Sequence, residues 1–283
     1  MNHPRTDHLI DLALEEDAGL GDLTSRAIFA PTHRSSAFIS AGQDLVVCGL
    51  EVAAKVFVRV DPALKVTLTA RDGDRVKKGG MVLRVTGPTI ALLTAERTAL
   101  NFLQRLSGIA TLSRKFAAAV AGTGVRIVDT RKTTPGWRVL EKYAVRCGGC
   151  HNHRSSLGEH VLIKDNHIAA AGSIARAVQK ARTAAPHLAK IEIEAKTLAE
   201  VRAAVRAGAE VILLDNMTPA QVQAAIATIG GAAAIEVSGG VRYETLRDYA
   251  LPGVDMISVG ALTHSAASAD LSLTLRAGKR GTS

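Results

Sequence analysis

Residues 191–215 read IEIEAKTLAEVRAAVRAGAEVILLD, and this stretch decides the fold class. Two apolar runs, residues 191–193 and 211–214, enclose residues 198–207, whose composition favours a helix. Two strands joined by a helix at this spacing predict a parallel pair with a helical crossover. The same alternation recurs at short, even spacing toward the C-terminus. The sequence therefore predicts an α/β protein whose parallel strands form a closed or nearly closed barrel.

Charged or glycine-rich residues follow each apolar run directly. In a parallel barrel the carboxyl ends of the strands meet on one face, and polar residues on that face indicate chemistry rather than stability. We therefore predict an enzyme whose substrates carry negative charge. The six runs are residues 125–128, 161–163, 191–193, 211–214, 235–237 and 257–259, and the residues that follow them are Asp129 to Lys132, Lys164 to Asn166, Glu194 to Lys196, Asp215 and Asn216, Ser238 to Gly240, and Gly260 and Ala261.

The N-terminal part of the chain has a different pattern, which predicts a small α+β unit. A helical stretch from residue 89 to about 120 then leads into the first barrel strand, with a predicted break near Ser107 and Gly108. The tail, residues 267–276, is predicted to form a last helix that folds back onto the small unit. Within this unit we expect helices at residues 7–18 and 50–60 and strands at residues 37–40, 45–48, 65–69 and 82–85. The expected domains are residues 1–108, joined by a C-terminal helix within residues 266–283, and the barrel at residues 109–265.

Composition restricts the class of protein. The chain has 283 residues, of which 47% are hydrophobic, so it can bury a substantial core. Its net charge of +9 suits nucleic acid, anionic membranes or acidic small molecules, but only 3% of residues are aromatic, which disfavours base stacking on single strands. Many cations instead lie at strand ends, which favours acidic small molecules.

No apolar stretch approaches the roughly 20 residues of a membrane span, and the first twenty residues are too acidic for a secretory signal. We expect a cytoplasmic protein with no nucleic-acid or membrane partner.

One long motif carries a family resemblance. Residues 129–136 read DTRKTTPG, and the motif continues through EKYAVR at 141–146 and NHR at 152–154 to LIKDNH at 162–167. This run resembles the decarboxylating quinolinate phosphoribosyltransferases. The resemblance implies a small N-terminal α/β sandwich domain and an open, incomplete α/β barrel of about seven strands, where the apolar runs alone identify six. Further stretches that resemble the family lie at residues 16–25, 93–97 and 259–265.

The resemblance also implies an activity. Members of this family join quinolinate to phosphoribosyl pyrophosphate, release CO₂ and pyrophosphate, and form nicotinate mononucleotide for de novo NAD biosynthesis. They use Mg²⁺ and no organic cofactor. They form homodimers, or hexamers of dimers, in which the active site lies at the subunit interface and Arg97 would reach the barrel of the partner.

Site residues follow from the positions that match the family. Arginine suits carboxylates because its planar fork donates two parallel hydrogen bonds, and glycine lets backbone amides approach a phosphate. Glu194 and Asp215 are expected to bind ribose hydroxyls and Mg²⁺, although pairing with cations such as Lys164 is an alternative role for both. The expected quinolinate contacts are Arg97, Thr130, Arg131, His153, Arg154 and Lys164, and the expected catalytic residues are Lys132, Lys164, Glu194 and Asp215. Phosphoribosyl pyrophosphate is expected to contact Lys132, Glu194, Asp215, Ser238, Gly239, Gly240, Gly260, Ala261 and Leu262.

Two departures and several alternatives accompany this interpretation. Cys147 and Cys150 precede His151 in the spacing of a haem attachment motif, and with His153 they offer four zinc ligands, or a redox dithiol. We interpret the pair as reduced thiols in a tight turn, since the family usually has glycine in place of Cys150. Lys196 stands where relatives tend to carry an acidic residue, which would alter the cation balance near the metal site. The alternative functions are a phosphoribosyltransferase that acts on nicotinate, a paralogue associated with molybdate transport, and a basic nucleic-acid-binding module.

Overall fold

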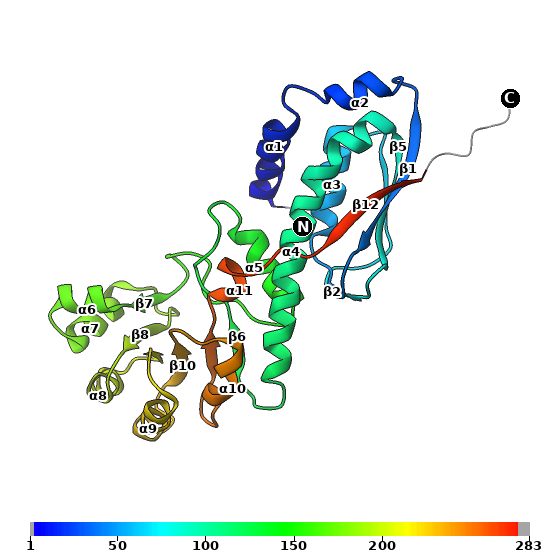
Figure 1. Cartoon of the computed structure of the whole chain (residues 1–283). Coiled ribbons are helices and arrows are strands. Elements are labelled where there is room, and N and C mark those ends of the chain that lie inside the picture. Colours follow the sequence, from blue (N-terminus) through cyan, green and yellow to red (C-terminus); the bar gives the residue numbers. More distant parts are fainter. Residues whose placement is uncertain (1–2, 277–283) are drawn as a thin grey trace. The chain divides into compact units, whose positions relative to one another are not determined.

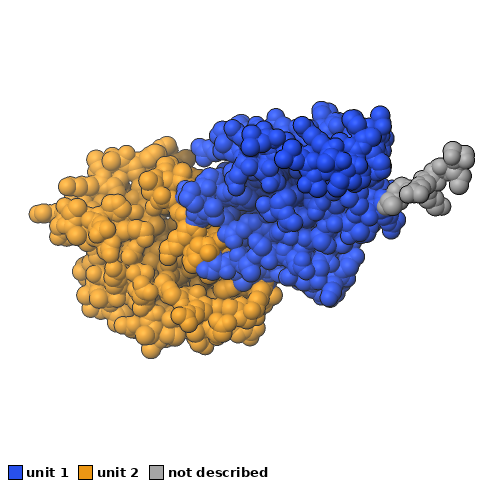
Figure 2. Space-filling view, turned by 45° about the horizontal axis from the view of Figure 1, so that its top comes forward, with its two compact units in different colours: residues 1–114, 133–149, 265–283 blue, residues 115–132, 150–264 orange. Residues whose placement is uncertain are grey.

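The structure, a computed structural model, describes residues 3–276 (Figure 1). It divides into two compact units, which Figure 2 distinguishes by colour. Unit 1 comprises Met1–Arg114, Thr133–Gly149 and Ser265–Ser283, and unit 2 comprises Lys115–Lys132 and Cys150–His264. Each unit has its own sheet, and the expected division of the sequence at residues 108 and 109 remains a prediction.

Unit 1 is built around a four-stranded antiparallel sheet in the order β12-β1-β5-β3. Helix α3 presents Val52, Val56 and Phe57 as a buried stripe, because residues four apart lie on the same helical face. A two-stranded sheet pairs β2 with β4. The elements are α1 (Pro4–Ala18), α2 (Leu23–Ile28), β1 (Arg34–Ala41), β2 (Leu45–Val46), α3 (Leu50–Val60), β3 (Lys65–Leu68), β4 (Arg75–Val76), β5 (Met81–Pro88), α4 (Thr89–Ala119, of which the last turn belongs to unit 2), α5 (Arg138–Cys147) and β12 (Leu271–Arg276).

Unit 2 contains six parallel strands in the order β6-β11-β10-β9-β8-β7. Strands β7 to β11 lie side by side in chain order, and the first strand, β6, pairs with the last, β11, as in a barrel. The predicted parallel α/β architecture is therefore confirmed. The elements are β6 (Arg126–Val128), β7 (Val161–Ile163), α6 (Asp165–Ala171), α7 (Ile174–Ala184), β8 (Ile191–Ala195), α8 (Leu198–Ala207), β9 (Val211–Asp215), α9 (Pro219–Ile229), β10 (Ala234–Ser238), η1 (Tyr243–Thr245), α10 (Leu246–Tyr249), β11 (Met256–Ser258) and α11 (Ala261–His264).

The stretch that decides the fold forms β8, α8 and β9, as its pattern predicts. Thr197 caps α8 by accepting a hydrogen bond from the Glu200 amide at 3.2 Å, and the Glu200 carboxylate accepts one from the Thr197 amide at 3.1 Å. Gly208 ends the helix in the left-handed conformation with φ of 75°. These local signals place the C-terminal end of β8 and that of β9 on the same edge of the sheet.

The barrel is open between β6 and β7. On the free edge of β6, Val128 forms a single parallel bridge with His151, which is all that the described residues contain of a seventh strand. The His151 amide donates to the Ile127 carbonyl at 2.8 Å, and the Asp129 amide donates to the His151 carbonyl at 3.1 Å. Residues 152–160 therefore lead from this edge of the sheet to β7 at the other edge.

Two expectations about elements are wrong. Helix α4 continues through Ser107 and Gly108, where a break was predicted. Gly108 is instead a site of close approach, because a Cβ atom there would collide with the Ala267 carbonyl, and the Ser107 hydroxyl lies 3.0 Å from the Cys48 amide that donates to it. The predicted C-terminal helix is also absent from the described residues, since Leu271–Arg276 forms strand β12 and pairs with β1. The alternation of Leu271, Leu273 and Leu275 with polar residues has the period of a strand. Residues 277–283 of that predicted helix lie outside the described residues.

Within residues 3–276, no helix combines the length and the apolar character that crossing a bilayer requires.

Candidate active site

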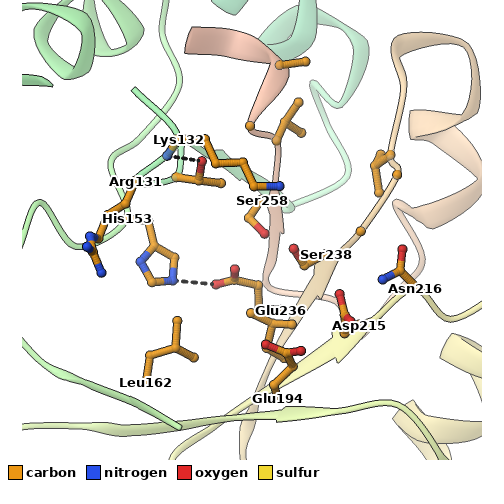
Figure 3. Close-up of a pocket in the computed structure, with 18 of the residues that line it drawn as sticks. Arg131, Lys132, His153, Leu162, Glu194, Asp215, Asn216, Glu236, Ser238 and Ser258 are labelled. Carbon is orange, nitrogen blue, oxygen red and sulfur yellow. Dashed lines mark hydrogen bonds and ion pairs between the residues drawn. The ribbon is translucent and has the colours of Figure 1, made fainter. Parts of the chain in front are cut away.

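A cavity of about 670 Å³ lies at the carboxyl ends of the parallel strands of unit 2 (Figure 3). Its lining residues come from the C-terminal parts of the strands and from the segments that follow them. They include Thr130, Arg131 and Lys132 after β6, His153 and Arg154 after the bridge, Lys164 after β7, Glu194 in β8, Asp215 and Asn216 at β9, Glu236 to Arg242 at β10, except Val237, and Ser258 to Ala261 and His264 at β11.

Asp129 fixes the segment that carries His153. Its carboxylate is fully buried and accepts hydrogen bonds from the His153 amide at 2.9 Å and from the Asn152 side chain at 2.6 Å. A buried carboxylate with such partners is held in one orientation, because losing either bond would leave a buried charge without compensation. The short motif Asn152, His153 and Arg154 is therefore anchored to the end of β6.

Two guanidinium groups converge on the cavity. Arg154 is only 7% exposed, and its Nη1 donates to the His160 carbonyl at 3.0 Å. Burial and the charge of Arg131 lower the pKa of Arg154, so the two cations repel each other. A dianion bound between them would relieve this repulsion, because opposite charge close to both groups stabilises their ionised forms.

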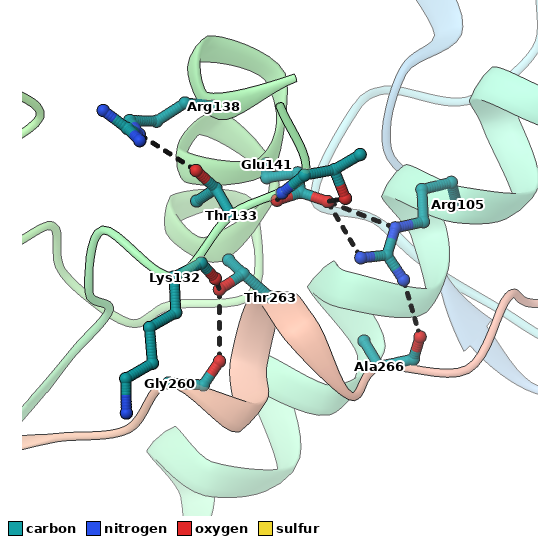
Figure 4. Close-up of polar contacts among 9 residues, drawn as sticks. Arg105, Lys132, Thr133, Arg138, Glu141, Gly260, Thr263 and Ala266 are labelled. Carbon is teal, nitrogen blue, oxygen red and sulfur yellow. Dashed lines mark hydrogen bonds and ion pairs between the residues drawn. The ribbon is translucent and has the colours of Figure 1, made fainter. Parts of the chain in front are cut away.

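The loop that follows Arg131 is fixed at two points. Thr263, which is fully buried, donates its hydroxyl proton to the Lys132 carbonyl at 2.7 Å (Figure 4). The aliphatic part of Lys132 lies against Gly260, where an added Cβ would approach its Cδ to 3.1 Å. The Lys132 amide also donates to the Thr130 hydroxyl at 3.1 Å. These contacts hold the main chain of Lys132 while its ammonium group projects into the cavity (Figure 3).

Lys164 and Glu194 form an ion pair, with Nζ and Oε2 separated by 2.9 Å. Lys196 lies nearby, since its Nζ is 2.8 Å from Asp165 Oδ2 and 4.0 Å from Glu194 Oε1. The hydrogen bond to Asp165 and the charges of Asp165, Glu194 and Asp215 raise the pKa of Lys196 against a smaller opposing effect of burial. The ammonium of Lys196 therefore offsets carboxylate charge at the ends of β8 and β9.

His153 is held between two buried glutamates. Its Nε2 lies 3.2 Å from Glu192 Oε2 and 3.5 Å from Glu236 Oε2. Burial lowers the pKa of His153, but the hydrogen bonds and charges of both carboxylates outweigh burial and raise the pKa to about 9. Burial raises the pKa of Glu192, and the negative charge of Glu236 adds to that effect. One proton on Nε2 thus serves both carboxylates, while Nδ1 accepts a hydrogen bond from the Arg154 amide at 2.7 Å.

The turn after β10 depends on two glycines. Gly239 and Gly240 have φ of 94° and 63°, which lie in the left-handed region, and a Cβ on Gly239 would collide with Asn216. Asn216 itself has φ of 55°, and its amide donates to the Ser238 carbonyl at 2.9 Å. The ends of β9 and β10 are therefore locked together. Successive amides in such a turn form a concave donor surface suited to anions.

The oxygen atoms of this wall also suit a divalent cation such as Mg²⁺. Glu194 and Asp215 line the cavity, and both charges act on Lys196. Carboxylate oxygens are the ligands that Mg²⁺ prefers, and it commonly takes one or two of them together with substrate oxygens. Lys164 contacts the Oε2 atom of Glu194. The Oε1 atom of Glu194, which lies 4.0 Å from Lys196 Nζ, remains available to a metal ion.

The structure brings most of the predicted site residues together in unit 2. Arg97 is exposed on α4 and belongs to unit 1. Leu262 is fully buried in α11, so its side chain does not reach the cavity. The cavity is lined by Thr130, Arg131, Lys132, His153, Arg154, Lys164, Glu194, Asp215, Ser238, Gly239, Gly240, Gly260 and Ala261.

Family descriptions match consecutive parts of the chain. The N-terminal domain of quinolinate phosphoribosyl transferase matches residues 22–107, and the C-terminal domain of the same enzyme matches residues 109–274. The chain belongs to the quinolinate phosphoribosyltransferase family.

Members of this family resemble the chain over nearly its whole length. A Bacillus subtilis protein named probable nicotinate-nucleotide pyrophosphorylase (carboxylating) is 43% identical over 273 residues, which cover 96% of this chain and 94% of the relative. A mitochondrial quinolinate phosphoribosyltransferase (decarboxylating) from Nicotiana tabacum is 39% identical over 297 residues, covering 96% and 83%. The crystal structure of NadC from Streptococcus pyogenes superposes with a TM-score of 0.93 at 40% identity, covering 98% of this chain and 99% of that one.

Two glutamates inside barrel strands were not among the site residues that the sequence predicted. Glu192 lies between Ile191 and Ile193, and Glu236 lies between Ile235 and Val237. An acidic residue inside an otherwise apolar barrel strand is costly to bury unless it has a partner. That pattern could have identified both residues as partners of a cation such as His153.

Cys147 and Cys150 were expected to be reduced thiols. Neither of them, nor Cys48, forms a disulfide in the structure. A hydrogen bond from Cys48 lowers the pKa of Cys147 against an opposing effect of burial, so Cys147 associates with Cys48 within unit 1. Cys150 is buried beside the bridge residue His151.

Proposed function

We propose that this chain is a decarboxylating quinolinate phosphoribosyltransferase, which converts quinolinate and phosphoribosyl pyrophosphate into nicotinate mononucleotide, CO₂ and pyrophosphate for de novo NAD synthesis. The observation that carries the proposal is the convergence of Arg131, Arg154, Lys132, Lys164 and protonated His153 on one cavity at the barrel strand ends. Two like unit charges about 4 Å apart repel by about 4 kcal/mol at an effective dielectric constant near 20. Cations are needed to bring two such anionic substrates together.

Quinolinate is assigned to the side of the cavity formed by Arg131, His153 and Arg154. Its adjacent carboxylates match two guanidinium forks and one imidazolium, each of which donates charge-assisted hydrogen bonds. Thr130 and Lys164 complete this set. The mutual repulsion of Arg131 and Arg154 supports the assignment, since a dicarboxylate removes it.

Phosphoribosyl pyrophosphate is assigned to the opposite wall. The 5′-phosphate would bind the amides of the turn at Ser238, Gly239 and Gly240 and those at Gly260, Ala261 and Leu262. Glu194 and Asp215 would accept hydrogen bonds from the ribose hydroxyls and hold Mg²⁺. When bound, Mg²⁺ would neutralise charge on the departing pyrophosphate. Lys132 is anchored close to Gly260 and would contact the same group.

The chemistry requires positioning and fixed charge rather than a covalent nucleophile. The C1′–O bond to pyrophosphate breaks, C1′ becomes oxocarbenium-like, and the pyridine nitrogen forms the new bond. The pyridinium nitrogen then accepts electron density as the adjacent carboxylate leaves as CO₂, and the ring carbon takes up a proton from a lysine or a bound water. No organic cofactor takes part in this scheme.

We also propose that the active unit is a homodimer, or a larger assembly of dimers. Arg97 is exposed on α4 in unit 1, whereas the cavity is lined by residues of unit 2. In an assembly it would reach the cavity of the partner and add a further cation for quinolinate.

Product analysis with separate substrates tests the proposal. The purified protein would be incubated with phosphoribosyl pyrophosphate, Mg²⁺ and quinolinate labelled with ¹⁴C in its 2-carboxyl group, or with nicotinate in its place. The proposal predicts nicotinate mononucleotide and stoichiometric ¹⁴CO₂ from quinolinate, and little product from nicotinate. Efficient turnover of nicotinate would instead assign the chain to the related nicotinate phosphoribosyltransferases.

A further inference from the structure

Two imidazoles and two carboxylates meet beside the cavity. His153 and His160 flank the segment that leads to β7, Glu192 lies within β8, and Glu236 lies within β10. His160 Nε2 is 3.8 Å from Glu192 Oε2, and the ligand atoms of His153, His160 and Glu192 all lie within 4.8 Å of one another. Glu236 joins this cluster through its 3.5 Å contact with His153 Nε2. All four residues belong to unit 2.

The carboxylates of this cluster are incompletely satisfied. Glu192 is 3% exposed and Glu236 is 1% exposed. Within the described part of the chain, no hydrogen-bond partner reaches the buried Oε1 atom of either residue. A single imidazolium therefore faces two buried carboxylates, each with an unpartnered oxygen, and such atoms are uncommon in folded proteins.

Three of these residues, His153, His160 and Glu192, place their ligand atoms close enough together for one metal ion. Nitrogen and oxygen ligands lie about 2.0–2.2 Å from Zn²⁺, so neighbouring ligands of a tetrahedron are about 3.3–3.6 Å apart. His153 Nε2 and His160 Nε2 lie 3.2 and 3.8 Å from Glu192 Oε2, and the ligand atoms of these three residues all lie within 4.8 Å of one another. Glu192 supplies one negative charge to a divalent cation, and Glu236 adds a second through its contact with His153.

We propose that His153, His160 and Glu192, with Glu236 in contact with His153, form a binding site for Zn²⁺ or a similar transition-metal ion, distinct from the Mg²⁺ position at Glu194 and Asp215. Imidazole ligands favour Zn²⁺ and Co²⁺, whereas Mg²⁺ selects oxygen atoms. Binding displaces the proton that His153 carries between the glutamates. Because His153 lines the cavity, an occupied site ties its imidazole to the metal ion, takes its N–H donor away from the quinolinate side and inhibits turnover. This inhibition rests on the proposed function, whereas binding of the metal does not.

A substitution at His160 can separate metal binding from substrate binding. Its ring does not line the cavity, and Arg154 bonds the backbone carbonyl of His160, which an alanine substitution retains. His160→Ala therefore removes a metal ligand while the residues assigned to the substrates stay in place.

The test is a titration of the full-length protein with Zn²⁺ in excess Mg²⁺, followed by competition with a chromophoric zinc indicator. Co²⁺ replaces Zn²⁺ in a parallel titration, where tetrahedral coordination gives intense visible absorption. We expect one Zn²⁺ per chain in the parent. His160→Ala and His160→Gln should bind about ten-fold more weakly or worse, since even loss of an indirect partner of a metal ligand has an effect of that size. The exposed His187 provides a matched control, and His187→Ala should bind as the parent does.

Activity provides the second readout. Without Zn²⁺, His160→Ala should turn over quinolinate at nearly the parental rate, and its inhibition should require about ten-fold more Zn²⁺. Equal zinc affinity of His160→Ala and the parent, a weak octahedral Co²⁺ spectrum, or the absence of a bound equivalent would each overturn the proposed site. Zinc binding without inhibition would overturn the effect on turnover and leave the proposed transferase function standing.

Discussion

His153 is a residue whose charge is set by groups that the linear motif does not contain. The motif places it next to Arg154, but its state depends on Glu192 and Glu236, which approach it from two other strands. The sequence could predict that His153 contacts the substrate. It could not predict the protonation, because that requires knowing which glutamates face the same point.

We predict that His153 stays protonated well above the pH at which an ordinary histidine loses its charge. Its pKa is raised to about 9, against about 6.5 for the unfolded chain. The ion pair therefore contributes stability fully below about pH 6.5, and this contribution is lost as the pH rises through about 9. The measurement is an NMR titration of histidine ring signals, assigned with His153→Gln. A titration midpoint of His153 below pH 7 would contradict its placement between the carboxylates of Glu192 and Glu236.

At the scale of elements, the turns after the barrel strands carry much of the site. The sequence predicted β8, α8 and β9 well because their signals are local: apolar runs, a capping box and a terminal glycine. It failed at α4 and β12 because contacts distant in the chain decide both. Gly108 lies against Ala267, and β12 pairs with β1.

Gly239→Ala should weaken binding of phosphoribosyl pyrophosphate. The substitution adds strain at φ of 94° and forces the new methyl group into Asn216, so the turn after β10 must move. Gly122→Ala is the matched control, because its φ is 83° and the space around it is open. Both substitutions should cost about 1–2 kcal/mol of stability from left-handed strain. Only Gly239→Ala should raise KM for phosphoribosyl pyrophosphate, measured by steady-state kinetics. An equal KM in the two variants would exclude this turn from the phosphate site.

A buried ion pair supports the segment that follows Lys132 (Figure 4). Glu141 is fully buried, and it accepts hydrogen bonds from the Thr134 amide at 3.0 Å and from Arg105 Nη2 at 2.8 Å. Glu141→Ala should lower the free energy of unfolding by about 3–5 kcal/mol, because Arg105 is left without its carboxylate. Urea denaturation measures this change. The double variant Arg105→Met with Glu141→Leu should regain part of the loss, and a double variant no more stable than Glu141→Ala would contradict the explanation.

At the scale of the whole molecule, one predicted quinolinate contact, Arg97, belongs to unit 1, whereas the cavity is built in unit 2. Arg97 is exposed on α4, although the other matched cations line one cavity. Sequence motifs show which residues a family uses but not which subunit supplies them. The proposed homodimer accounts for Arg97 by placing it in the cavity of a partner.

Mixing two inactive variants tests the shared site. In a hybrid of Arg97→Ala with Lys164→Ala, one of the two sites has both native residues and the other has neither. If half of the dimers are hybrids, about a quarter of the wild-type activity should return, as the symmetry of a dimer requires. Activity is measured after confirmed subunit exchange. No recovery would place Arg97 in its own subunit's site or outside catalysis.

The central claim is that the paired guanidinium groups in the barrel cavity select a dicarboxylate, and calorimetric titration with quinolinate and with nicotinate tests it most directly. Hydrogen bonds to charged groups contribute about 1.5–3 kcal/mol each, so losing the second carboxylate should weaken binding by about ten- to a hundred-fold. Arg154→Lys keeps the charge but loses the planar fork, so it should reduce the difference in affinity between quinolinate and nicotinate. The exposed Arg202→Lys serves as the control and should leave the gap unchanged. Equal affinity of the parent protein for quinolinate and nicotinate would contradict the claim.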